Sequence, residues 1–313
     1  MLELNKYYIQ SNENLRDIFT IIYTLIDDIY LEVTPVHIQN RRNVGESNLS
    51  DSEIITIAIL GEAFGLCSEK SWFNFIKREY IDLFPKIGDR TRFNRTKNNL
   101  HDTILNIQRN MLSLIGYEKD KLRIIDSMPI AVCEFGRAKF AKSFKGIASY
   151  GYCASKKETF FGFKLHALCT QNGFISDFVL TCANVDDREA VWDLVNQYTD
   201  ISIIGDKGYV NKRLSPELKN ERQIKLIFMK RDNDKSQYTK NFRQIIFKIR
   251  RRIETSFSQL SEQFNVNKVL SKSIIGLQTR ITLKVLSHNI CYIINKLLGN
   301  EDSIGKIKHL IFG

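Results

Sequence analysis

The stretch LRIIDSMPIAV, residues 122–132, places one acid inside an apolar run whose Ile and Val content is typical of a β-strand. Asp126 alternates in phase with Leu122, Ile124 and Met128. A carboxylate in the interior of an apolar strand is costly unless it is paired or bound to a metal. Asp126 is therefore either a buried acid satisfied by its neighbours or part of a site.

The sequence after this strand continues with strands and then alternates helices with strands. Residues 159–170 and 173–183 are two apolar runs separated by the turn QNG, which predicts a hairpin. Residues 186–198 follow as a helix, for which Asp186 and Asp187 are most simply caps. The alternation then continues through a strand at 201–205, a helix around 212–223, a strand at 224–229 and a long helix from about Tyr238 to Phe264. This order predicts an α/β fold, a mixed sheet with helices on its faces.

Residues 1–115 predict an all-helical domain ahead of the sheet. A first apolar stripe recurs at helical spacing, namely Ile18, Ile21, Ile22, Leu25, Ile26 and Ile29. Ser50 and Glu53 form a capping-box pattern that opens a second helix, and Gly65 ends it before a third. Helix, glycine turn and helix outline a helix-turn-helix, but they are also common in plain helical bundles. DNA binding or dimerisation are the roles expected of this domain.

The remaining boundaries follow from the same patterns. We expect the domain built on the sheet at residues 120–270 and a C-terminal helical extension at 271–313, in which residues 272–298 form one more amphipathic helix.

Composition favours a polyanionic partner. The 313 residues include 46 Lys plus Arg against 35 Asp plus Glu, a formal net charge of +11. No signal-peptide pattern and no run of about 18 apolar residues occurs, so we expect a soluble, cytoplasmic protein without a membrane partner. The six cysteines lack a C-x-x-C pair and are interpreted as core residues.

Two further acids occupy positions that suit a site. Asp206 follows the strand ISIIG at its carboxyl end, where open mixed sheets place their sites. Glu254 lies in IRRRIETSFSQL, residues 249–260, at the border of the apolar stripe of the last helix. Taken singly, Asp206 is also readable as a turn residue and Glu254 as a salt-bridge partner within its helix. The joint placement of both with Asp126 favours a shared site.

Three carboxylates held together need a counter-charge, because they repel one another. Two Mg²⁺ ions roughly 3.5–4 Å apart would supply it, activating a nucleophile and stabilising the departing oxygen of a phosphodiester. Asp126, Asp206 and Glu254 are the candidate catalytic metal ligands, with Mg²⁺ as cofactor and Mn²⁺ as a substitute. Arg250 and Arg251 precede Glu254 by four and three residues, so they lie on its side of the helix and can neutralise phosphates.

Other basic residues are candidates for contact with DNA. Lys164 and His166 share one face of the strand 159–170, and both could reach a scissile phosphate if that strand lies beside the strand of Asp126. Lys207 directly follows Asp206. Further candidates are Arg92, Arg95, Arg137, Lys139 and Lys142. A structural role for His166 and a solvated surface for the others are the alternatives.

Two longer tracts combine basic with aromatic or apolar residues. Residues 133–157, CEFGRAKFAKSFKGIASYGYCASKK, suit backbone contacts with stacking on splayed or single-stranded ends, and equally an ordinary surface loop. Residues 230–252 lead into Glu254 and favour DNA contact.

These motifs carry a resemblance to a known family. RIIDSMPIAVC, GFKLHALCT, IIGDKGYV and RRRIETSFSQL, with the upstream LSDSEIITIAILGEAFG and RTRFNR, resemble bacterial transposases of the insertion sequence family 982. The spacing of the acids, 79 residues between Asp126 and Asp206 and 47 between Asp206 and Glu254, is similar to that of DDE transposases with a ribonuclease-H-like catalytic domain. The resemblance covers nearly the whole chain.

One signature of related insertion-sequence groups is only partly present. Those groups carry a tyrosine seven residues before the glutamate, an arginine four before it and a lysine seven after it. The corresponding residues here are Phe247, Arg250 and Ser261, so only the arginine is retained.

The resemblance implies a metal-dependent DNA endonuclease and strand transferase. It implies Asp126, Asp206 and Glu254 as metal ligands, and double-stranded DNA as the partner, both the terminal inverted repeats of the protein's own element and target DNA. One site would first expose a 3′-hydroxyl at the element end and then join it to the target. A homodimer in the assembled complex and a bacterial protein that associates with the nucleoid when acting are further expectations. The alternatives are a non-catalytic helix-turn-helix DNA-binding regulator and a metal-dependent nuclease without strand transfer.

Overall fold

The computed structural model describes residues 15–42, 44, 47–154, 156–209, 213–230 and 237–310. The chain divides into two compact units. One comprises residues 116–259, and the other comprises residues 1–115 with residues 260–313.

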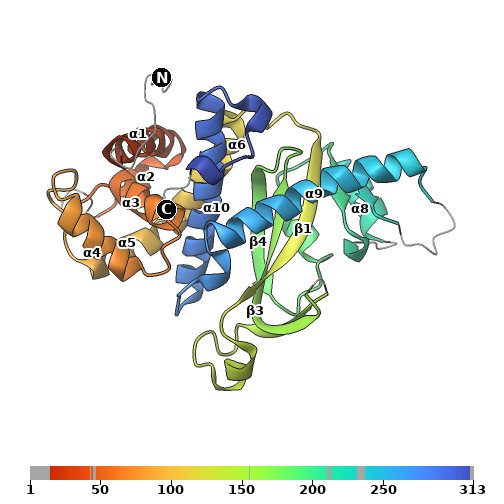
Figure 1. Ribbon diagram of the computed structural model, residues 1–313, viewed down its shortest axis with the longest axis horizontal. Coiled ribbons are helices and arrows are strands. Elements are labelled where there is room, and N and C mark those ends of the chain that lie inside the picture. Colours follow the sequence, from red (N-terminus) through yellow and green to blue (C-terminus); the bar gives the residue numbers. More distant parts are fainter. Residues whose placement is uncertain are drawn as a thin grey trace. The chain divides into compact units, whose positions relative to one another are not determined.

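The unit of residues 116–259 is built on a six-stranded mixed sheet (Figure 1). Its strands are β1 (Leu122–Ala131), β2 (Ser149–Cys153), β3 (Glu158–Cys169), β4 (Ile175–Cys182), β5 (Ser202–Gly205) and β6 (Lys225–Phe228). β3 pairs antiparallel with β1, β2 and β4, whereas β5 is parallel to β1 and β6 is parallel to β5. An antiparallel group followed by parallel strands is a ribonuclease-H-like sheet, so the predicted fold class is confirmed.

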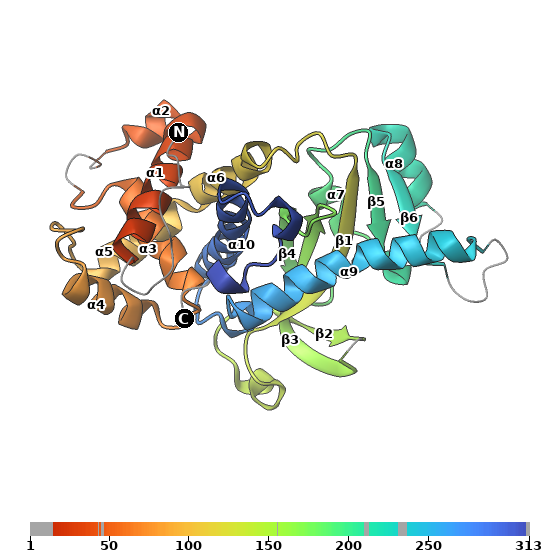
Figure 2. The same ribbon diagram turned by 45° about the horizontal axis from the view of Figure 1, so that its top comes forward.

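Three helices accompany the sheet: α7 (Ala190–Leu194), α8 (Leu214–Arg222) and α9 (Lys240–Glu262). Apolar residues of α7 and α8 form one core with inward residues of β1, β3 and β5, including Ile125, Leu168 and Ile203. α9 runs along the sheet in both views (Figure 2). Its predicted stripe is confirmed, because Ile246 and Ile253 are buried.

Two details of this unit differ from the predictions. α7 covers only five of the residues predicted as a helix at 186–198. β2 was not predicted as a strand, because its sequence SYGYC is short and contains a glycine, and pairing with residues 158–162 of β3 is what makes it one.

The unit of residues 1–115 and 260–313 is all helical in its described part, apart from turns and loops. Its helices are α1 (Leu15–Val33), α2 (Val36–Gln39), α3 (Asp51–Ala63), α4 (Glu69–Glu79), α5 (Arg90–Asn99), α6 (His101–Leu114) and α10 (Ile274–Leu297). The predicted capping box of α3 is confirmed, because the Glu53 N–H donates to Ser50 Oγ at 3.1 Å and the Ser50 N–H donates to a Glu53 carboxylate oxygen at 2.6 Å. Over the described residues, no helix is both long and apolar enough to cross a bilayer.

α10 is buried over most of its length, which the sequence pattern did not predict. It packs against α3 and α6, and even Lys284 and His288 have no exposed surface. The helix predicted at 272–298 is confirmed as α10, but the prediction that it is amphipathic was wrong, because these polar residues find partners inside the unit and do not mark a solvated face.

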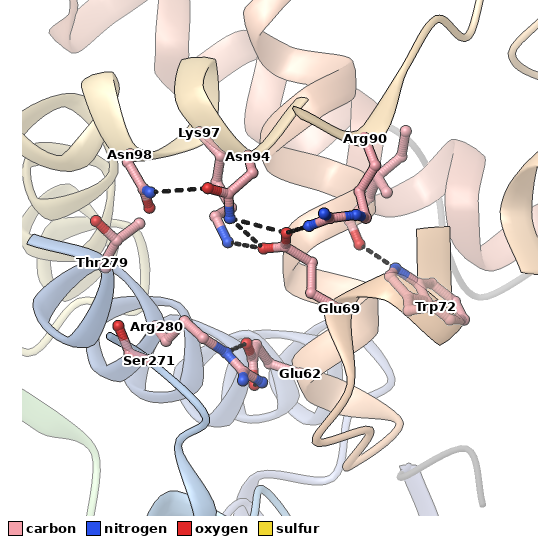
Figure 3. Close-up of polar contacts among 12 residues, drawn as sticks. Glu62, Glu69, Trp72, Arg90, Asn94, Lys97, Asn98, Ser271, Thr279 and Arg280 are labelled. Atoms are coloured by element: carbon pink, nitrogen blue, oxygen red, sulfur yellow. Dashed lines mark hydrogen bonds and ion pairs between the residues drawn. The ribbon is translucent and has the colours of Figure 1, made fainter. Parts of the chain in front are cut away.

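Two acids of this unit sit in networks of cations (Figure 3). Glu62 on α3 accepts hydrogen bonds from Arg280 Nε at 2.7 Å and Nη2 at 3.0 Å, and its Oε2 lies 2.5 Å from Lys284 Nζ. Glu69, the first residue of α4, accepts from Asn94 at 2.8 Å and pairs with the buried Lys97. These networks connect α3, α4, α5 and α10.

His288 predicts a pH dependence of stability. Burial lowers the pKa of His288 to about 4, against the opposing hydrogen bond with Asn289. The unfolded chain binds this proton below about pH 6.5 while the folded chain does not, so folding weakens as the pH falls from there towards 4. Between pH 7 and pH 5 the loss through this residue is about 2 kcal/mol.

His288→Gln tests this dependence by urea denaturation at both pH values. The variant is expected to lose about 2 kcal/mol less than the wild type between pH 7 and pH 5. An equal loss in both proteins would contradict the assignment.

Candidate active site

Asp126 lies on β1, and Asp206 directly follows β5, the parallel neighbour of β1. Ile124 of β1 pairs with Ile204 of β5, and each aspartate follows its isoleucine by two residues. Because strand side chains alternate, both carboxylates are expected on the same face of the sheet. Burial raises the pKa of Asp126 to about 6, opposed by the Ser127 N–H and by Arg250, and the charges of Asp206 and Glu254 raise it further. Asp206 and Glu254 are thus each within electrostatic reach of Asp126.

One guanidinium connects Asp126 with Glu254. Arg250 Nη1 donates to Asp126 Oδ2 at 3.4 Å, and Nη2 donates to Glu254 Oε1. Arg250 and Glu254 lie one turn apart on α9, as the helical spacing predicts. Ser256 Oγ, further along the same helix, donates to the Gly173 carbonyl between β3 and β4 at 2.7 Å. α9 is therefore held against the sheet where it presents Glu254 to Asp126.

The donor set fits a divalent metal ion by its chemistry. Asp126, Asp206 and Glu254 offer only carboxylate oxygens, the donor type that Mg²⁺ and Mn²⁺ prefer. As the side chains stand, no group of three carboxylate, histidine or cysteine residues in the described ranges could hold one ion together. The Arg250 guanidinium instead provides the counter-charge between Asp126 and Glu254.

The turn after β5 anchors Asp206. The Tyr209 N–H donates to the Asp206 carbonyl at 3.1 Å, and the Tyr209 ring is buried in the core with α7 and α8. Burial raises the pKa of Tyr209 well above its usual value. Lys207 begins this turn and is half-buried.

Lys164 and His166 lie on the other face of the sheet. β1 and β3 are neighbours, as the prediction required, but Ser127 is opposite His166 and Asp126 is opposite Ala167. Lys164 and His166 therefore share the face of Ser127. His166 is fully buried, with Nε2 2.9 Å from Thr181 Oγ1. The expectation that both residues reach a phosphate beside Asp126 is not met, because the register turns them away from it.

Asp187 contacts the polar residues of that second face. Its Oδ1 accepts from Lys164 Nζ at 2.6 Å, and its Oδ2 accepts from Ser127 Oγ at 3.1 Å. His166 Nδ1 lies 3.9 Å from the same carboxylate. Because Ser127 also donates its N–H to Asp126 Oδ1 at 2.8 Å, the network ends directly at Asp126.

The sequence-based interpretation of this acid was wrong. Asp186 and Asp187 were expected to cap a helix, but the residue before α7 is Glu189, which makes no side-chain cap. Asp186 instead accepts from the Arg188 N–H at 2.9 Å. The only signal in the sequence for this network was the pair of adjacent aspartates. Its partner Ser127 lies 60 residues from Asp187 along the chain, so no local pattern joins the two.

Asp187→Asn is expected to lower the free energy of unfolding by about 1–3 kcal/mol, because the half-buried Lys164 loses its charged partner. Asp186→Asn is the matched control, since its partner Arg188 is 41% exposed, and it should change stability by less than about 1 kcal/mol. Urea denaturation of both variants measures the difference. Equal changes in the free energy of unfolding would show that the network around Asp187 stabilises the fold no more than an exposed ion pair does.

The other predicted basic residues are exposed. Arg251 lies on α9, with its guanidinium carbon 4.8 Å from the centre of the Phe247 ring. Arg137, Lys139 and Lys142 follow β1, and in the other unit Arg92 and Arg95 lie on α5. Residues 231–236 of the basic tract at 230–252 lie outside the described residues.

Comparison with known proteins relates part of the chain to a protein family. Residues 117–274 match a protein family described as "Transposase DDE domain". No curated protein and no solved structure matches the chain. The matched range is just over half of the 313 residues, and it contains all six strands and the three acids Asp126, Asp206 and Glu254. The chain therefore belongs to the transposase DDE-domain family, whose members have a transposase or nuclease type of function.

Proposed function

We propose that this chain is a DNA transposase of the insertion sequence family 982 type. It cleaves DNA at the terminal inverted repeats of its own element and joins the freed ends to target DNA. The observation that carries the proposal is the electrostatic cluster of Asp126, Asp206 and Glu254, contributed by two adjacent strands and one helix of a transposase-family domain.

The three acids would hold divalent ions, Mg²⁺ or Mn²⁺. Such ions, when bound, favour formation of the nucleophile and neutralise charge on the departing oxygen. The chain itself supplies position and charge. The Ser127 N–H orients the Asp126 carboxylate, and Arg250 neutralises Asp126 and Glu254 until cations or DNA arrive. In this proposal the exposed Arg251 contacts the phosphates of the bound strand.

Phosphoryl transfer depends mainly on positioning and electrostatics, so one rigid site serves both cleavage and joining. Two element ends have to meet before they are joined to the target. We therefore propose that two copies of the chain act together on double-stranded DNA, each holding one end.

The test incubates purified protein with Mg²⁺, DNA that carries the inverted repeats flanking its own reading frame, and a separate target plasmid. Sequencing of the products is expected to show cut element ends and ends joined to the plasmid, both abolished by EDTA. Cleavage without joining would instead identify a nuclease, and binding without cleavage a regulator.

A further inference from the structure

The segment that connects β1 with β3, residues 132–158, carries large exposed rings, and all of it except Ser155 is described. Phe140 is 83% exposed, Tyr152 64% and Phe135 56%. Aromatic rings of this size are normally largely buried. Several exposed rings on one short segment therefore mark a surface that binds a partner.

Two of the exposed rings belong to a strand of the sheet, and one of them packs against neighbouring rings. Tyr150 and Tyr152 are the exposed residues of β2, and alternation puts them on the same face about 7 Å apart. The Tyr150 ring lies 5.0 Å from the ring of Phe161 on β3 and 6.0 Å from that of Phe135, measured between centroids. Rings fixed in this way lose little side-chain freedom when a flat ligand stacks on them.

The loop that precedes β2 is anchored as well. Phe144 is buried and meets Phe163 of β3 edge to face, with centroids 5.5 Å apart. The Ile147 carbonyl accepts from Cys182 Sγ at 3.0 Å. The segment extends beyond the end of the sheet of its own unit from this anchor (Figures 1 and 2).

The same segment carries an excess of positive charge. The exposed cations of the segment are Arg137, Lys139, Lys142, Lys145, Lys156 and Lys157, against the acids Glu134 and Glu158. Arg137 and Glu134 are 3.7 Å apart but each more than four-fifths exposed, so this pair neutralises little. A second copy of the chain would bring the same positive charge and be repelled, whereas a polyanion is attracted.

We propose that this aromatic–basic segment, residues 132–158, binds single-stranded DNA. Unpaired bases stack on Phe140, Tyr150 and Tyr152, and the cations contact the phosphates. A duplex keeps the faces of its bases inside the stack, so exposed rings add nothing to duplex binding. An anionic membrane also attracts cations and rings, but the segment lies in the unit that carries the transposase domain. The proposal rests on the proposed function and adds unpaired DNA as a ligand of this unit.

The test measures fluorescence anisotropy of labelled DNA with full-length protein in EDTA, so that binding is separated from cleavage. Three probes are compared: a blunt duplex, the same duplex with an unpaired tail, and a single strand. Phe140→Ala with Tyr152→Ala removes the two most exposed rings. Phe140→Tyr with Tyr152→Phe keeps both rings, and Leu31→Ala with Val36→Ala removes exposed apolar groups from the other unit.

The alanine pair is expected to weaken binding of the tailed and single-stranded probes at least about tenfold and to leave the blunt duplex unchanged. The ring-conserving pair and the Leu31/Val36 pair should match the wild type on all probes. Equal loss on the blunt duplex, or no loss on any probe, would overturn the proposal. So would a ring-dependent dimer in sedimentation, or ring-dependent binding to phosphatidylserine vesicles without an effect on DNA.

The difference in binding between unpaired and blunt DNA is tested separately from the proposed function, so failure of one can be told from failure of the other. Joining of element ends depends on the carboxylates and is read from sequenced products. The binding contrast is read without any metal ion, so each result can be positive or negative by itself.

Discussion

Glu254→Gln is expected to reduce cleavage and joining at least about a hundredfold while leaving the fold intact. Glutamine keeps the shape of the side chain but carries no charge, so it is a poor ligand for a hard divalent cation. The Glu254 side chain is 47% exposed, and Arg250 keeps its contact with Asp126 when Glu254 is neutralised, so the fold is expected to persist. The measurement is the rate of product formation in Mg²⁺, beside a urea denaturation curve for the same preparation.

The matched control for this variant is Glu217→Gln, which removes another exposed acid from a helix of the same unit. It is expected to keep the wild-type rate. Joining at the wild-type rate by the Glu254 variant would remove this glutamate from the proposed site, and with it the role assigned to α9.

Glu62→Gln is expected to lower the free energy of unfolding by about 3–5 kcal/mol, the largest effect on stability that we predict. Burial acts to raise the pKa of Glu62, but the charges of Lys284 and Arg280 outweigh it and lower the pKa overall. Neutralising the acid removes the carboxylate that pairs with both buried cations. The carbonyl of Phe264, 2.5 Å from Lys284 Nζ, replaces only part of the lost interaction.

Urea denaturation at neutral pH measures this effect, with Asp82→Asn as the control. Asp82 also pairs with an arginine, Arg16, but both side chains are at least half exposed, so its loss should change stability far less than the loss of Glu62. The lowered pKa of Glu62 also predicts the direction in which stability changes with pH. Its contribution is present above the unfolded value near 4.5 and is lost as the pH falls below it. A loss below about 1 kcal/mol in the Glu62 variant would contradict the cluster's role.

Local patterns in the sequence predicted most of the secondary structure. Alternating apolar residues marked β1, β3 and β4, and the stripe of Ile246 and Ile253 marked α9. The capping box at Ser50 and Glu53 marked the start of α3. These signals depend on neighbours within a few residues, so they survive without knowledge of the rest of the chain.

Two misjudgements came from contacts between distant residues. β2 becomes a strand by pairing with β3, and α10 is buried although its sequence carries Lys284 and His288. Glu62, 222 positions before Lys284 in the chain, is the partner that makes this burial possible. A partner so distant along the chain produces no periodic pattern in the sequence of either helix.

The sequence by itself determined which acids the proposed site consists of: an acid inside a strand at Asp126, an acid after a strand at Asp206 and an acid on a helix border at Glu254. Only the tertiary structure determined which other residues lie beside these acids. The register of β1 against β3 sent Lys164 and His166 to the opposite face, where Asp187 holds Lys164, and packing of α9 brought Arg250 to Asp126. Periodicity is a property of one segment, whereas register and helix packing are chosen by the free energy of burying several segments together, and so they appear only in the folded chain.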